Sequence, residues 1–197
     1  MPVKTPLEPS ITHFSPWPLV LVTSSDAQGR PNIIALAAAS PCSFRPPTLG
    51  IAVAPGRYSH GLIAERGEFG VNLPARADLE RADLCGCLSG RDVDKFVETG
   101  FTPLPGERIA VPLIAECPVG FECRLVHTVH LGSHDWFVGE IVAARADAAV
   151  VTAAGHVDPR KLDGVTCTWG RYFAQGLEVG AWHFAGRSHS ARAKPRE

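Results

Sequence analysis

The sequence predicts a mainly β protein, an antiparallel barrel with short helices packed on its outside. Two observations support this prediction. Short apolar, β-prone runs recur along the chain, with turn signals rich in Gly, Pro and Asp between them. Helical patterns are few, and each is short. Many strands with two or three short helices favour a closed antiparallel barrel over a parallel sheet.

Four strands are expected in the first half of the chain, at residues 19–23, 31–37, 48–54 and 69–73. The turn at 26–29 joins the first two as a hairpin. Pro46-Pro47 and Pro55-Gly56 bound the third strand, and Pro74 ends the fourth.

Three short helices are expected between the strands, at residues 60–66, 76–84 and 93–99. Ser59 is expected to cap the first helix and Asp92 the third, because short polar side chains accept hydrogen bonds from free helical N–H groups. Gly67 and Gly100 are expected to end the same two helices. Residues 85–90, which Gly interrupts, are interpreted as a loop.

The second half contains the longest expected strands. Residues 103–118 are interpreted as loop with a little extended structure. Residues 121–131 alternate well enough for a long strand, and residues 136–144 return as its antiparallel partner after the Gly132-Ser133 turn. Residues 147–152 are expected to extend that sheet. The predicted barrel interior is supplied by Leu19, Leu21, Val53, Val71, Phe121 and Val138.

Length and composition are those of one ordinary globular domain. The 197 residues are 45% hydrophobic and 20% charged, with a formal net charge of -1, so nothing indicates binding to nucleic acid or to an anionic membrane. No apolar run approaches the roughly 20 residues that span a bilayer. Residues 1–10 lack an apolar signal core, so a cytoplasmic location is expected. We expect one domain over residues 1–186 and a basic, disordered tail over 187–197.

Several kinds of chemistry are disfavoured. The chain has no G-x-S-x-G and no H-E-x-x-H, so a hydrolase is not indicated. His127, His130 and His134 suggest a metal site, but the first two are an odd number of residues apart and point to opposite faces of a strand. Two ligands do not complete a zinc site. The six cysteines are interpreted as reduced, mostly buried thiols, so no metal is predicted.

A phosphate site is indicated at two helix starts, although no P-loop and no G-x-G-x-x-G occurs. Ser59 and His60 open one helix just after Arg57. Lys95 lies in the first turn of another, where a cation is unfavourable unless an anion is nearby. The alternative is an ion pair of Lys95 with Asp92 or Glu98, and the residues alone leave both interpretations open.

Several short segments together resemble a known family. They are Trp17-Pro-Leu-Val-Leu-Val-Thr23, Gly29-Arg-Pro-Asn32, Arg57-Tyr-Ser-His60, Val71-Asn-Leu-Pro74, Asp92-Val-Asp-Lys-Phe96, Gly132-Ser-His134 and Val138-Gly-Glu140. Their order and approximate spacing resemble the flavin-reductase-like, FMN-binding split-barrel family, in particular its flavoredoxin-like branch. The resemblance implies a six-stranded antiparallel split barrel, a homodimer, and FMN bound non-covalently at the subunit interface.

The resemblance also implies site residues. Asn32, Ala38, Ala39 and Ser40 match positions that line the flavin. Ser59 and His60 match the phosphate loop, and Lys95 matches the basic contact to phosphate or ribityl. His134 matches a histidine near the flavin or the nicotinamide, where it is a candidate catalytic residue. Trp169 and Tyr172 match an aromatic position close to the ring.

Three functions are compatible with the resemblance. One is an NAD(P)H-dependent flavin oxidoreductase that delivers electrons to a partner monooxygenase or another acceptor. Another is an electron-carrier protein with tightly bound FMN and no direct reaction with NAD(P)H. A third is an FMN-binding protein without turnover. FMN supplies the redox chemistry in each case, so the protein needs only to bind it, tune it and leave one ring face open.

Overall fold

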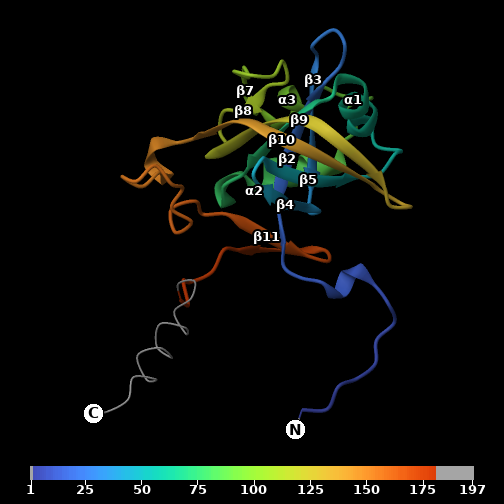
Figure 1. Ribbon diagram of the computed structural model, residues 1–197, viewed down its shortest axis with the longest axis vertical. Helices are drawn as coiled ribbons and strands as arrows, with labels where there is room; N and C mark the ends of the chain where they lie inside the picture. Colours follow the sequence, from blue (N-terminus) through green and yellow to red (C-terminus); the bar gives the residue numbers. More distant parts are fainter. Residues whose placement is uncertain (1, 181–197) are drawn as a thin grey trace.

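A seven-stranded antiparallel sheet forms the body of the protein (Figure 1), which a computed structural model describes over residues 2–180. Its strand order is β3-β2-β6-β9-β10-β5-β4. The strands are β2 (Val20–Ser25), β3 (Pro31–Leu36), β4 (Ala39–Phe44), β5 (Pro47–Val53), β6 (Glu68–Leu73), β9 (Val119–His130) and β10 (Asp135–Ala146). The mainly β, antiparallel prediction is confirmed. The predicted tail at 187–197 lies outside the described residues.

The sheet curls around one apolar cluster, here called the barrel core. Its buried members are Val20, Val22, Ile34, Ile51, Val53, Ile63, Phe69, Val71, Cys123 and Phe137. They come from six strands and α1 (Tyr58–Arg66). β3 also contacts β5, although the two are far apart in the strand order. Because these strands share one interior, the sheet forms a barrel, and β4 pairs with β5 as a seventh strand at its edge.

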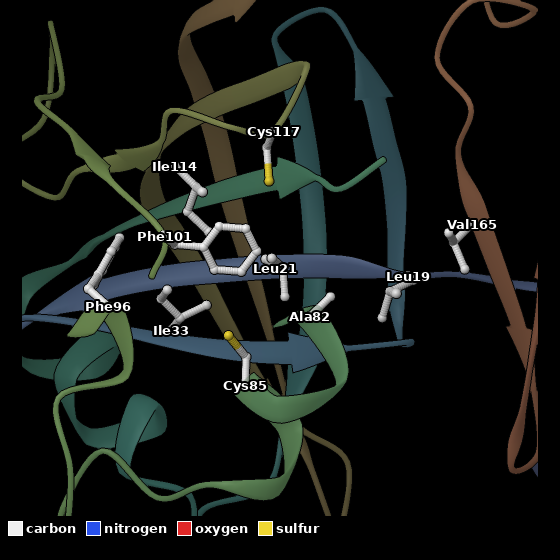
Figure 2. Close-up of a cluster of buried hydrophobic side chains, with 10 residues drawn as sticks. All are labelled: Leu19, Leu21, Ile33, Ala82, Cys85, Phe96, Phe101, Ile114, Cys117 and Val165. Carbon is white, nitrogen blue, oxygen red and sulfur yellow. The ribbon is translucent and has the colours of Figure 1, made fainter. Parts of the chain in front are cut away.

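A second apolar cluster, here called the outer cluster, packs two helices against the opposite face of the sheet (Figure 2). These helices are α2 (Leu79–Cys87) and α3 (Lys95–Thr99). Figure 2 shows Ala82 and Cys85 of α2 pointing toward Leu21 and Ile33, with the Phe101 ring beside them. Burial of these side chains fixes both helices, since each is too short to be stable alone.

The remaining strands form two small sheets. β1 (Trp17–Pro18), β11 (Val165–Thr168) and β12 (Arg171–Ala174) form one, which lies beyond one end of the barrel in Figure 1. β7 (Pro103–Leu104) and β8 (Leu113–Ile114) form the other. Three 3-10 turns complete the order, η1 (Ile11–His13), η2 (Arg76–Asp78) and η3 (Ala148–Val150). Within residues 2–180, no helix is long and apolar enough to cross a membrane.

Both predicted hairpins are confirmed, since β2 pairs with β3 and β9 with β10. Several local predictions were wrong. Ser59 is not a cap, because Arg57 occupies that position and no side chain caps α1. Asp94, not Asp92, caps α3 and accepts hydrogen bonds from two backbone N–H groups. The expected loop at 85–90 begins as helix and the expected strand at 147–152 contains η3.

The predicted barrel interior was wrong in register at β2. Leu19 and Leu21 lie in the outer cluster, whereas Val20 and Val22 face the barrel core. Side chains alternate along a strand, so a prediction displaced by one residue exchanges the two faces. The Leu-Val-Leu-Val run is apolar on both faces, so the sequence does not indicate which of its residues face the barrel core. Val138 is likewise only half-buried, and its neighbour Phe137 is in the core.

Glu122 of β9 joins the loop between β7 and β8 to the barrel. Its fully buried carboxylate accepts hydrogen bonds from the backbone N–H groups of Glu107, Arg108 and Ile109, at 2.6–3.2 Å. Arg145 of β10 lies 3.6 Å from the same carboxylate. A buried charge is tolerated only with such partners. This one carboxylate therefore organises a loop that has little regular structure.

We expect Glu122→Gln to lower the free energy of unfolding by about 2–4 kcal/mol. The amide keeps one acceptor, but its NH2 group would face backbone donors. Urea unfolding measures the change. Glu80→Gln is the matched control on an exposed helical position, where the expected change is within about 0.5 kcal/mol. Equal stability of the two variants would show that the Glu122 network contributes nothing.

Candidate functional site

A cavity of about 340 Å³ lies where several segments meet. β3 contributes Asn32, and the start of α1 contributes Arg57, Tyr58 and Ser59. The remaining walls come from the end of β5 and the turn after it, from the end of α2 and the segment that joins it to α3, from Lys95 at the start of α3, and from His134 at the β9–β10 turn. This volume is in the range of small-molecule sites, and the mixture of apolar and polar walls is typical of them.

The lining of this cavity is strongly basic. It includes Arg57, Arg91 and Lys95, and the described part of the chain contributes no Asp and no Glu to it. Arg91 is held in place, because its Nη1 donates to the carbonyl oxygen of Gly56 at 3.2 Å and its guanidinium lies 5.5 Å from the centre of the Tyr58 ring. Cations gathered without carboxylates repel one another, so the cavity favours an anionic ligand.

Lys95 is the buried cation of this group, with 4% of its surface exposed. Its Nζ donates to the carbonyl oxygen of Cys85 at 2.7 Å. Burial lowers the pKa of Lys95, and the nearby Arg57 lowers that pKa further. The ion pair of Lys95 with Asp92 or Glu98, left open by the sequence, is not formed within residues 2–180. An anion in the cavity would stabilise the charged ammonium.

Asn32 and Ser59 form a polar corner of the same cavity. Asn32 Nδ2 donates to Ser59 Oγ at 2.8 Å, and both side chains are buried. Asn32 Oδ1 is buried and has no hydrogen-bond partner among residues 2–180. A Cβ at Gly90 would collide with the side chains of Asn32 and Tyr58, so this wall requires glycine. An unpaired buried amide oxygen costs free energy until a ligand donor satisfies it.

These features fit FMN. The cations and the hydroxyl of Ser59 suit a phosphate group, and the free Asn32 oxygen suits a hydroxyl or N–H donor of the ligand. Lys95, Arg57 and Arg91 would hold the phosphate, with Ser59 and Asn32 beside it.

A second cavity of about 340 Å³ adjoins the first and shares Ala35, Leu36 and Gly86 with it. Its other walls include Trp17, Trp169 and Tyr172. Three aromatic residues around an apolar floor suit a planar ring.

Tyr172 joins β12 to α2. Its hydroxyl donates to Asp83 Oδ1 at 2.6 Å. Burial and this hydrogen bond raise the pKa of Tyr172 above its usual range, so the phenol stays protonated. Trp169, by contrast, is 71% exposed at the mouth of the second cavity.

The structure brings together some of the predicted site residues and not others. Asn32, Ser59, Lys95 and His134 line the first cavity, and Trp169 and Tyr172 line the second. Ala38, Ala39 and Ser40 line neither, because the chain turns away after β3 and Ala39 begins β4. His60 also lies outside both linings and instead contacts Asp135. The roles of all these residues stay predictions.

Sequence reasoning missed Arg91 and Gly90. Both lie in the segment between α2 and α3, which was interpreted only as a loop. A basic residue directly after Ser-Gly and before a helix was the available signal, because glycine permits close approach of a ligand and arginine suits phosphate.

The cysteines and histidines suggest no second redox or metal centre. No group of three metal-ligating side chains occurs within residues 2–180. All six cysteines are free thiols. Cys85 lies beside Lys95, yet burial raises the pKa of its thiol to about 11, with Lys95 opposing the shift. Cys85 is therefore protonated at neutral pH and is not a thiolate nucleophile.

Comparison with known proteins gives concordant results. The chain is 34% identical to flavoredoxin of Desulfovibrio vulgaris (Miyazaki F), with a TM-score of 0.87 over 93% of this chain and 100% of that one. A relative from Archaeoglobus fulgidus is 39% identical over 113 residues, which cover 57% of this chain but only 64% of that protein. YddH of Escherichia coli is 39% identical over 150 residues, or 74% of this chain and 79% of YddH.

The fold also matches a protein with a split barrel domain from Shewanella frigidimarina, with a TM-score of 0.78 and 22% identity over 84% of this chain and 85% of that one. This likeness confirms the split-barrel prediction, although the sheet has seven strands rather than six. The family model described as flavin reductase like domain matches residues 13–169, which include both cavities apart from Gly170, Arg171 and Tyr172. The chain therefore belongs to the flavin reductase like family.

Proposed function

We propose that this protein is an FMN-binding oxidoreductase that takes electrons from NAD(P)H and passes them to a partner monooxygenase or another acceptor. The observation that carries the proposal is the pairing of the two cavities. A basic cavity without carboxylates adjoins an aromatic one, and the two share a floor of small and apolar residues. A flavin mononucleotide has the same division, with an anionic phosphate at one end and a planar ring at the other.

The residues of this chain bind and orient the cofactor. Lys95 supplies a fixed positive charge from the first turn of α3, and Arg57 and Arg91 add charge at the more open side of the cavity. Charge-assisted hydrogen bonds to phosphate are stronger than neutral ones. When bound, FMN supplies hydride acceptance and one-electron transfer.

His134 is the residue proposed to act nearest the reaction. It lines the first cavity from the β9–β10 turn, and its Nδ1 lies 2.9 Å from Ser133 Oγ. The serine hydroxyl orients the ring and leaves Nε2 free for the ligand. There His134 would donate a hydrogen bond to the cofactor or pack against the nicotinamide. A donor placed where negative charge grows accelerates reduction.

A second candidate function is an electron carrier with tightly bound FMN. The full-length likeness to a flavoredoxin supports it. The visible spectrum of the purified protein, recorded before and after anaerobic addition of NADH or NADPH, separates the two. Bleaching of the flavin band supports the reductase, and a stable oxidised spectrum supports the carrier. A protein that takes up no FMN would refute both.

We further propose that the protein is a homodimer. Apolar side chains are exposed at several places outside the barrel, among them Phe14, Phe44, Trp169 and Phe173. Phe44 is on the edge strand β4, and Phe173 is on β12. Side chains such as these are candidates for contact between two copies of the chain.

Lys95→Met is expected to weaken FMN binding by about 10- to 150-fold, from about 1.5–3 kcal/mol for a hydrogen bond to a charged group. Methionine retains the length of the apolar stem. Flavin fluorescence titration measures the dissociation constant. Riboflavin, which lacks the phosphate, should lose little affinity in the same variant. Lys161→Met, at an exposed position, is the control. An unchanged FMN dissociation constant would remove Lys95 from the phosphate site.

His134→Gln and His134→Ala are expected to slow NAD(P)H oxidation by at least about tenfold, because a donor to developing charge is lost. FMN affinity and steady-state NAD(P)H oxidation are measured together. A loss of turnover alone assigns His134 to hydride transfer, and a loss of affinity alone assigns it to cofactor binding. If both variants match the parent within about twofold, roughly 0.4 kcal/mol, His134 has neither role.

Sedimentation equilibrium at micromolar concentration is expected to give about twice the chain mass of 21.0 kDa. Phe44→Asp should shift the protein toward monomer if β4 belongs to the interface, because burying the new carboxylate is costly. A parent protein that sediments at 21.0 kDa would contradict the dimer.

A further inference from the structure

Asp135, the first residue of β10, lies where three elements meet. It pairs with His130 at the end of β9 and with Val53 at the end of β5. The chain that follows β5 leads directly into α1, whose third residue is His60. The position therefore joins the β9–β10 turn to the first turn of α1.

The carboxylate of Asp135 is held by two imidazoles. Its Oδ2 lies 2.7 Å from His60 Nε2, and its Oδ1 lies 2.8 Å from His130 Nδ1. Only 5% of the residue is exposed. The hydrogen bonds from His130 and His60 lower the pKa of Asp135, so the carboxylate is ionised and accepts from both rings. Each of its oxygens thus has a fixed donor.

The ring of His60 is fixed on its other side by the barrel core. Its centroid lies 4.9 Å from that of Phe137, at an interplanar angle of 53°. Phe137 is fully buried. A tilted contact of this kind is a favoured aromatic arrangement. His60 therefore has both a carboxylate partner and a buried aromatic partner.

Both ends of this connection adjoin the first cavity. His60 follows Ser59, which accepts the hydrogen bond from Asn32. Asp135 follows His134, which also lines the cavity. The β9–β10 turn is further closed by a hydrogen bond from Leu131 N to the carbonyl oxygen of His134, at 3.0 Å. Two walls of one cavity are thus joined through a single carboxylate that does not itself line the cavity.

We propose that Asp135 is a positioning residue of the cofactor cavity. Its carboxylate, which accepts hydrogen bonds from His60 and His130, fixes the first turn of α1 against the β9–β10 turn. It thereby sets the distance between Ser59 and His134. The inference rests on the proposed function only for the choice of FMN as the probe. It assigns His60 to the support of the cavity instead of to contact with phosphate.

The connection has a spectroscopic signature that does not involve flavin. Because a carboxylate only accepts, His60 must carry a proton on Nε2 and His130 must carry one on Nδ1. Nitrogen-15 NMR of the histidine side chains distinguishes these tautomers. We expect opposite tautomers for His60 and His130 in the parent, and loss of the Nδ1-protonated form of His130 in Asp135→Asn. The Nε2 tautomer at His130 in the parent would overturn the proposal.

Amide hydrogen exchange tests whether Asp135 connects the start of α1 to the β9–β10 turn. In Asp135→Asn, exchange is expected to accelerate both at residues 58–61 and at residues 131–134, while β2 stays protected. Asp147→Asn makes the same chemical change at an exposed residue just after the far end of β10 and should alter neither segment. Acceleration at the β9–β10 turn alone would overturn the proposal, because α1 would then be held by other contacts.

FMN affinity tests the consequence for the site. Asp135→Asn is expected to raise the FMN dissociation constant about tenfold, while Asp147→Asn leaves it unchanged. His60→Gln retains an N–H donor and should keep more affinity than His60→Leu. Equal affinity for all four variants, with the parent binding FMN, overturns the positioning role alone. A parent that binds no FMN refutes the proposed function, and the NMR and exchange results then decide on Asp135 independently.

Discussion

The burial of β2 on both of its faces is the constraint on which the site depends. All six residues from Val20 to Ser25 are buried. One face closes the barrel core, and the other carries the outer cluster on which α2 and α3 rest. α3 begins at Lys95, whose ammonium is bound by a carbonyl oxygen of α2. The position of the buried cation is therefore set by apolar packing, not by charged partners.

The basic cavity is costly to maintain in the absence of a ligand. Lys95 is nearly excluded from water beside Arg57, and the amide oxygen of Asn32 has no partner. Each of these features lowers stability by itself, because desolvated charge and unpaired polar atoms are both unfavourable. A bound phosphate-bearing ligand would relieve both at once. These binding groups are thus held in place at the expense of stability.

The architecture was predicted from the sequence better than the positions of individual side chains were. Turn residues and apolar runs predicted both hairpins, because Gly29 and Gly132 do adopt the positive φ that such turns need. The register of β2 was not predictable from a run that is apolar on both faces. β4 was missed because Ala39–Phe44 is mostly exposed and lacks an alternating pattern. The resemblance predicted Asn32, Ser59, Lys95 and His134 of the first cavity and Trp169 and Tyr172 of the second, whereas Gly90 and Arg91 of the first cavity were missed.

The histidines show why spacing alone was insufficient. The alternation of side chains along a strand correctly placed His127 and His130 on opposite faces, but it did not identify the hydrogen-bond partner of either histidine. His130 pairs across the hairpin with Asp135, whereas His134, one residue before that aspartate, faces the cavity. His60 lies 75 residues before Asp135 in the sequence and forms the second hydrogen bond to the same carboxylate. An imidazole can support a site or act in it, and the fold decides between these roles by the group it places opposite the ring. In this protein the two proposed roles fall on adjacent positions, since Asp135 is proposed to support the cavity and His134 to contact the ligand.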